Sequence, residues 1–148
     1  MDFESQIQKD VHERVGLWMK EIFGERAAPL ESGPGYRGHF GSASIEVSVS
    51  PWGDNEAVIL ARAVVVSGAT INAELMRYLL DKNCEVRFGA FGIDKNGDIV
   101  FQHAIVGSAC QKEELKASVQ GVMLVADLSD EDIVARWGGR RAIDRSPR

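Results

Sequence analysis

The sequence predicts an α+β fold in which helices cover one face of an antiparallel sheet. Residues 42–50 alternate apolar and polar side chains, which is the pattern of a strand with one buried and one exposed face. Residues 2–24 instead repeat apolar side chains every three to four positions, as an amphipathic helix does. Pairs of strand-like segments stand between the helical segments, which favours an antiparallel sheet. We therefore expect one domain with about five strands, in the order α-β-β-β-α-β-β-α.

Composition and charge fit a globular domain and disfavour two kinds of partner. The chain has 148 residues, of which 45% are hydrophobic and 26% are charged, and its net charge is −5. An acidic protein lacks the clustered Lys and Arg that bind phosphate, so we expect no nucleic-acid partner. No apolar run approaches the roughly 20 residues of a membrane helix, and residues 1–10 do not resemble a secretory signal. We therefore expect no membrane partner.

The two cysteines predict neither a disulfide framework nor a metal motif. Cys84 and Cys110 are not arranged as CxxC, and both have apolar neighbours. We expect both side chains to be buried as small hydrophobic groups. A cytoplasmic, reducing compartment is the simplest interpretation of this cysteine usage.

The N-terminal half is expected to contain one helix and three strands. The helix over residues 2–24 is followed by a segment rich in proline and glycine at residues 25–38, which predicts a loop. This loop leads into a short strand at residues 36–40. The alternating strand described above is then joined by the turn PWGDN to a strand at residues 56–66. Because this last strand is apolar on both faces, we expect it to lie centrally in the sheet.

The middle of the chain is expected to form a helix and a hairpin. The helix over residues 69–83 has Asn72 to cap its first turn, and Asn83 is expected to end it in a left-handed conformation. Residues 84–93 and 98–107 then predict two strands.

Two helices are expected after this hairpin. The first spans residues 108–127 and begins with Ser108 and Gln111 as a capping box. The second is short, spans residues 129–137, and is started by Ser129 as its N-cap.

The stretch FGIDKNGDIVF places oxygen-bearing side chains at Asp94, Asn96 and Asp98, as a calcium-binding loop does. The loop of an EF-hand also needs glycine at position 6 and glutamate at position 12, but Ile99 and Ile105 stand there. Asn-Gly between two apolar strands is instead the signal of a two-residue hairpin turn, in which both residues take positive φ. We therefore expect a turn and no calcium site.

The remaining polar residues give no motif for catalysis, for a cofactor or for a metal ion. His12, His39 and His103 lack the spacing of zinc ligands. His103 shares the parity of the apolar residues in its strand, so we expect a partly buried histidine and not a catalytic one. Cys110 follows a turn, which disfavours a Cys–His pair with His103. The acidic run at residues 127–132 is expected to cap a helix. We predict no catalytic, cofactor-binding or metal-binding residue.

Four side chains are candidates for contact with a partner. Trp52 lies in the turn PWGDN and Trp137 precedes two glycines, and aromatic residues at such places are often partly exposed. The alternative for both is packing at the rim of the core, against the first helix. A free edge of the sheet is expected to accept an extended peptide. Met76 and Tyr78 lie on the second helix, whose alternative role is to pair two subunits. The predicted partner-binding residues are therefore Trp52, Met76, Tyr78 and Trp137.

The order of these segments resembles the YbjN family, whose fold is similar to that of type III secretion chaperones. The resemblance rests on the aromatic N-terminal helix and on the stretches ELMRYLLDKN, VRFGAFGIDKNGDIVF and EELKASVQGVMLVADLSDEDIVARWGG, over residues 3–138. It implies a type III secretion chaperone-like domain at residues 1–138. Residues 139–148 lie outside it and carry four arginines, so we expect a basic, disordered tail.

The resemblance also implies a function. Members are bacterial, often dimeric, bind peptide or protein segments, and have no known catalytic residues, so we expect a chaperone-like, non-catalytic homodimer with a protein or peptide client. Some members are labelled sensory transduction regulators, which leaves a regulatory adaptor as an alternative that uses the acidic surface or the arginine-rich tail. An uncharacterised enzyme is the third alternative, and it needs a deep pocket that holds His103 with a second titratable group.

Overall fold

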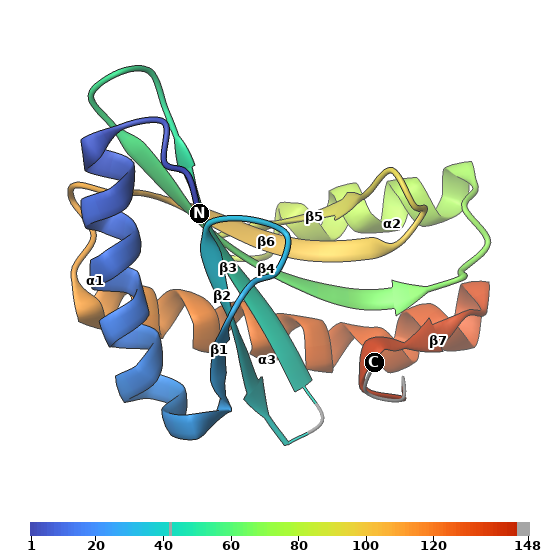
Figure 1. Cartoon of the computed structure of the whole chain (residues 1–148). Coiled ribbons are helices and arrows are strands. Elements are labelled where there is room, and N and C mark those ends of the chain that lie inside the picture. Colours follow the sequence, from blue (N-terminus) through green and yellow to red (C-terminus); the bar gives the residue numbers. More distant parts are fainter. Residues whose placement is uncertain (42, 145–148) are drawn as a thin grey trace.

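Three α-helices and seven strands make up the fold in the computed structural model, which describes residues 1–41 and 43–144 (Figure 1). In chain order the elements are α1 (Gln6–Phe23), η1 (Gly24–Arg26), β1 (Ala27–Pro29), β2 (Gly35–Phe40), β3 (Ala43–Pro51), β4 (Ala57–Ser67), α2 (Ala73–Asn83), β5 (Ala90–Ile93), β6 (Ile99–Val106), α3 (Lys112–Trp137), β7 (Arg140–Arg141) and η2 (Ala142–Asp144). The predicted α+β class is confirmed. The sheet has seven strands and not about five, because β1 and β7 are too short for a sequence pattern.

All pairs in the sheet are antiparallel, in the order β1-β2-β3-β4-β6-β5. β4 lies between β3 and β6, which confirms the central position predicted from its apolar sequence. β7 pairs with the last residues of β4, Val66 and Ser67, beyond the part of β4 that β3 covers.

One face of the sheet and all three helices share a single apolar core. Ile45, Val47 and Val49 of β3 are at most 1% exposed, as their alternation predicts. Fully burying such a side chain stabilises the fold by about 1.5–3 kcal/mol. α1 contacts β2 and β3, while α3 runs along β3, β4 and β6, so the two helices cover different parts of the same face (Figure 1).

Both outer edges of the sheet are closed to further strands. β1 has three residues and ends at Pro29, which has no N–H to donate. At the other edge, the side chain of Asn83 accepts a hydrogen bond from the N–H of Phe91 and donates one to its carbonyl oxygen, at 2.7 and 3.4 Å. Asn83 thus occupies the backbone N–H and carbonyl of Phe91, which a neighbouring strand would need to pair with β5.

The predicted helix boundaries need four corrections. α1 begins at Gln6, capped by Ser5, and not at residue 2. Residues 112–137 form one continuous helix, with Ser129 inside it, because Ala126, Asp130 and Ile133 extend the buried stripe past the expected break. Ser108 and Gln111 do not form a capping box, since the Ser108 side chain donates to Glu56. Asn83 has no left-handed conformation, because its side chain is already held by β5.

The hairpin between β5 and β6 confirms a turn at residues 94–98 but not its two-residue form. The N–H of Gly97 donates to the carbonyl of Asp94 at 2.9 Å, and Gly97 has φ 79° while Asn96 keeps a negative φ. The side chain of Asp94 accepts from the backbone N–H groups of Asn96 and Asp98. Asp94 therefore organises the turn, which is longer than Asn-Gly alone predicts.

Residues 140–144 of the predicted disordered tail form regular structure, contrary to expectation. Arg140 and Arg141 pair with β4, and η2 follows over Ala142–Asp144. Residues 145–148 lie outside the described residues.

Candidate functional site

The face of the sheet opposite the core is not covered by any helix of the described residues. Val58, Leu60 and Val64 of β4 point to this open face and are only partly buried. Val106 of β6 adds an aliphatic side chain that is 41% exposed. Exposed aliphatic side chains that lie together on a sheet are typical of contact surfaces.

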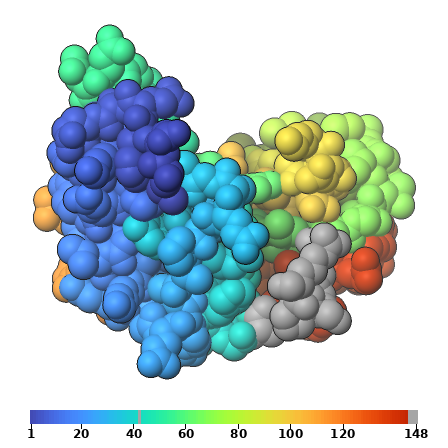
Figure 2. Space-filling model, viewed as in Figure 1, coloured from blue at the N-terminus to red at the C-terminus, as the bar shows by residue number. Residues whose placement is uncertain are grey.

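The open face is hollowed beside the β5–β6 hairpin. The hollow has a volume of about 530 Å³ and is lined by Leu60, Arg62, Gly92, Ile93, Asp94, Lys95, Asn96, Val100 and Gln102. Figure 2 shows the molecular surface hollowed between the cyan β2–β3 region and the yellow β5–β6 hairpin. The floor is aliphatic and the rim is polar, which suits a segment with both kinds of group.

An ion pair fixes the rim of this hollow. Arg62 Nη2 lies 2.6 Å from Asp94 Oδ2, and both side chains are less than one-third exposed. Burial alone would raise the pKa of Asp94, but hydrogen bonds from the backbone of Asp98 and Asn96 and the charge of Arg62 lower it below its ordinary value. Asp94 therefore stays ionised, and the hairpin is tied to the central strand.

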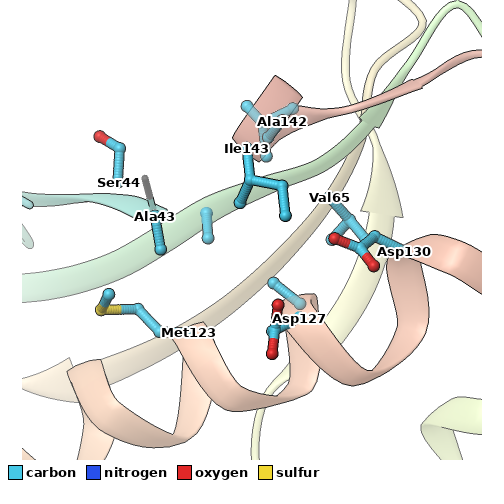
Figure 3. Close-up of a pocket in the computed structure, with 11 residues that line it drawn as sticks. Ala43, Ser44, Val65, Met123, Asp127, Asp130, Ala142 and Ile143 are labelled. Atoms are coloured by element: carbon cyan, nitrogen blue, oxygen red, sulfur yellow. The ribbon is translucent and has the colours of Figure 1, made fainter. Parts of the chain in front are cut away.

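A second, smaller hollow lies where β3 separates from β4 (Figure 3). Pairing between these strands begins at Glu46 and Arg62, so the first residues of β3 diverge from β4. The hollow has a volume of about 20 Å³, and its walls come from β3, β4, α3 and η2: Ala43, Ser44, Ala63, Val64, Val65, Met123, Ala126, Asp127, Asp130, Ala142 and Ile143.

A buried carboxyl group lines this small hollow. Asp130 is 3% exposed, and its Oδ1 has no hydrogen-bond partner among the described residues. Burial raises the pKa of Asp130, and the backbone of Glu131 and the charge of Arg141 only partly oppose this. A buried, unpaired carboxyl oxygen is unfavourable, so this position favours a donor that the fold does not supply.

The four predicted partner-binding residues do not form one site. Trp52 is 60% exposed at the turn between β3 and β4, and Met76 is 44% exposed on α2. Tyr78 packs on Trp137, with ring centroids 5.0 Å apart, and its hydroxyl donates to Asp132. Trp137 is 6% exposed, which fits the alternative of packing at the rim of the core, but it packs against Tyr78 of α2 and not against α1.

His103 is partly buried on the core side, as its parity predicts. Its Nδ1 lies 2.9 Å from Ser118 Oγ, its ring packs on Phe88, and burial lowers its pKa. Neither hollow described above is lined by His103. The two cysteines differ: burial raises the pKa of Cys110 to about 11, so its thiol stays protonated, but Cys84 is exposed, contrary to expectation.

Sequence reasoning missed Leu60, Arg62 and Asp94 as lining residues. Leu60 belongs to residues 56–66, which are apolar on both faces. That pattern predicted a central strand but did not show that one face stays uncovered. Asp94 was expected only as part of a turn, and its contact with Arg62 joins residues 32 positions apart. No local pattern encodes such a pair.

The described residues contain no group of three or more His, Cys, Asp or Glu side chains placed to hold a metal ion. Within the same part of the chain, no helix is long and apolar enough to span a membrane.

Residues 9–145 match the sequence model of a known family, TY-Chap1, described as the T3SS (YopN, CesT) and YbjN peptide-binding chaperone 1. The chain belongs to this family. The resemblance stated from sequence motifs is thereby confirmed, and the TY-Chap1 match also runs past residue 138. No curated protein matches the sequence.

Two solved structures share the fold of this TY-Chap1 member. A chain in the crystal structure of the ExsC–ExsE complex is 17% identical, with a TM-score of 0.66, and the match covers 90% of this chain and 97% of that one. YbjN from E. coli is 12% identical, with a TM-score of 0.59 and coverage of 82% and 92%. At these identities the likeness concerns the fold.

Proposed function

We propose that this chain is a non-catalytic module that binds an extended peptide or protein segment on the open face of its sheet. The observation that carries the proposal is the uncovered aliphatic surface of β4 and β6, with the hollow of about 530 Å³ beside it. Membership of a peptide-binding chaperone family supports the same class of ligand.

The geometry favours recognition by side chains over recognition by strand addition. Extended peptides often join a free sheet edge, but Asn83 and Pro29 close the two edges here. On the open face, Leu60 offers an apolar floor while Gln102 and Asn96 offer polar groups at the rim. A client with alternating apolar and polar side chains would match this surface.

The change Leu60→Asp tests this function. Peptides selected from a displayed random library on the wild-type chain should bind it saturably, with one peptide per chain by calorimetry. Leu60→Asp should weaken binding at least tenfold, because a charge replaces the apolar floor. Mass spectrometry should recover the peptide intact, as expected without catalysis.

The matched control is Leu128→Asp, since Leu128 is 72% exposed on α3, away from the open face. This variant should bind selected peptides as the wild type does. If the library yields no binder, or if both variants bind equally well, the open face is not the binding surface.

We also propose that two copies pair through the outer side of α2. Met76 and Leu80 are 44% and 63% exposed and lie one helical turn apart. Sedimentation equilibrium should give a dimer for the wild type and a monomer for Met76→Glu combined with Leu80→Glu. Leu128→Glu should remain dimeric, and a monomeric wild type would contradict the proposal.

The adaptor alternative makes a different prediction. It assigns binding to the acidic surface or to the arginine-rich tail, whereas Arg141 is already engaged by Glu131 and Asp144 within the chain. Deleting residues 139–148 should abolish partner binding for an adaptor. Binding on the open face should survive the deletion.

A further inference from the structure

We propose that a gap in the sheet beside β4 is a second peptide-binding site, and that residues 140–144 of the chain are its built-in occupant. Its ligand is a peptide that pairs with β4 through a basic residue and places an aliphatic residue two positions later, within a 3-10 turn, in the hollow. The inference rests on the proposed peptide-binding function but concerns a surface other than the open face.

The gap is an interruption in the pairing along one edge of β4. β3 pairs with this edge as far as Arg62, and β7 pairs with it again at Val66 and Ser67. Between them, no strand of the described residues pairs with Ala63–Val65 on this side. The small hollow of Figure 3 opens at this place, with α3 behind it.

Residues 140–144 make the contacts there that a foreign peptide would make. Arg140 and Arg141 pair with Ser67 and Val66 at the end of the gap, and η2 then lies beside β3 and β4. Arg141 Nη1 lies 2.9 Å from Glu131 Oε1. Two residues later, Ile143 points into the hollow (Figure 3). Strand pairing, a salt bridge and an aliphatic side chain in a pocket together form a recognised mode of peptide binding.

The occupant is held loosely enough to be displaced. β7 has only two residues, and in its ion pair with Arg141 the Glu131 side chain is 79% exposed, so this pair stabilises little. The segment is tethered by Gly138 and Gly139, which have φ 74° and 89°. A Cβ on Gly139 would lie 2.5 Å from the carbonyl oxygen of Ser67, so the route onto β4 requires glycine.

The occupant also leaves one group of the site unsatisfied. Asp130 lines the hollow, is 3% exposed and keeps Oδ1 without a partner among the described residues. Asp127 and Glu131 add two more carboxylates at this end of α3, so the gap is complementary to a positive peptide. A peptide whose donor reaches Asp130 would bind better than the built-in segment.

The test uses the full-length chain and a fluorescent peptide, GRRAID, which copies residues 139–144. In the variant Arg141→Ala with Ile143→Asp, the tethered segment loses both anchors. A tethered segment acts at an effective concentration on the order of millimolar, so the wild type should resist the peptide. Fluorescence anisotropy should show binding to the variant at least tenfold tighter than to the wild type. The matched peptide GRAADD should bind neither protein.

A second measurement covers the case in which the variant does not fold. Hydrogen exchange of wild-type amides at residues 140–144 should accelerate when millimolar GRRAID is added, and GRAADD should have no effect. The proposal is wrong if GRRAID leaves this exchange unchanged, or if both peptides bind or act alike.

A failure of GRRAID binding at the gap can be distinguished from a failure of peptide binding on the open face. Adding Leu60→Asp to the double variant should leave GRRAID affinity unchanged, because Leu60 faces the open face and not the gap. If GRRAID fails while selected peptides still depend on Leu60, the gap proposal fails and the proposed function stands.

Discussion

Two glycines with nearly the same backbone conformation have different surroundings. Gly89 has φ 82° and Gly97 has φ 79°, a region that costs a residue with a Cβ about 1–2 kcal/mol. A Cβ on Gly89 would lie 2.8 Å from the Phe101 ring, whereas a Cβ on Gly97 would meet nothing within 4 Å. A comparison of substitutions at Gly89 and Gly97 therefore distinguishes the cost of backbone strain from the cost of steric overlap.

The changes Gly89→Ala and Gly97→Ala should differ in cost. Gly97→Ala should lower the free energy of unfolding by about 1 kcal/mol through backbone strain alone. Gly89→Ala should lower it by about 3 kcal/mol or more, because Phe101 must also move within a packed core. Urea unfolding of both variants measures the difference, and equal losses would mean that Phe101 yields without cost.

At the scale of elements, α1 and α2 each begin at a side chain that bonds the backbone, whereas α3 begins without such a cap. Asn72 Oδ1 accepts from the N–H of Leu75 at 2.9 Å and caps α2. Ser129 was expected to do the same for a separate helix, but it lies within α3. A residue that can cap a helix thus does so only where a helix begins.

Asn72→Ala and Ser129→Ala provide the corresponding comparison. Asn72→Ala should lower the free energy of unfolding by about 1 kcal/mol through loss of the cap. Ser129→Ala should change it by no more than about 0.5 kcal/mol, since alanine is the better residue inside a helix. Thermal or urea unfolding tests this; a large loss at Ser129 would indicate two separate helices.

The elements that sequence predicted well have a pattern several residues long. Ile45, Val47 and Val49 alternate because successive side chains of a strand point to opposite faces, and burial of one face preserves that alternation. β1 and β7 span three and two residues, too few to show a period. β1 pairs with the next strand, β2, whereas β7 pairs with β4, which is distant in sequence. Neither pairing follows from a pattern within the short strand itself.

The candidate site was less predictable than the fold. An aliphatic residue such as Leu60 has the same sequence signature whether a helix covers it or not. Which face of the sheet stays open depends on where α1 and α3 pack, and that is decided by the whole core. Trp137 illustrates the converse, because Tyr78 of another helix buries it.

At the scale of the whole molecule, stability depends on a core that holds a histidine uncharged. His12 is 8% exposed, its ring stacks on Tyr36, and its Nε2 has no hydrogen-bond partner among the described residues. Burial lowers the pKa of His12, although the charge of Glu13 partly opposes this. The unfolded chain therefore binds a proton more readily than the folded one.

The free energy of unfolding should fall as the pH decreases below about 6.5, the ordinary pKa of histidine. Above that pH both states are neutral and the contribution is fully present; it is lost as the pH falls through the lowered pKa of the folded state. His12→Phe should keep the stacking and make the loss between pH 7.5 and 5.5 smaller. Urea unfolding at the two pH values tests this, and an equal loss in both proteins would contradict it.

The contact between Asn83 and Phe91 has a consequence for the protein at high concentration. Because the side-chain amide of Asn83 bonds the backbone of Phe91, a second copy cannot pair a strand with β5 there and so begin a cross-β assembly. Concentrated samples should therefore form no amyloid-like fibres, and a single side chain, that of Asn83, is sufficient for this protection.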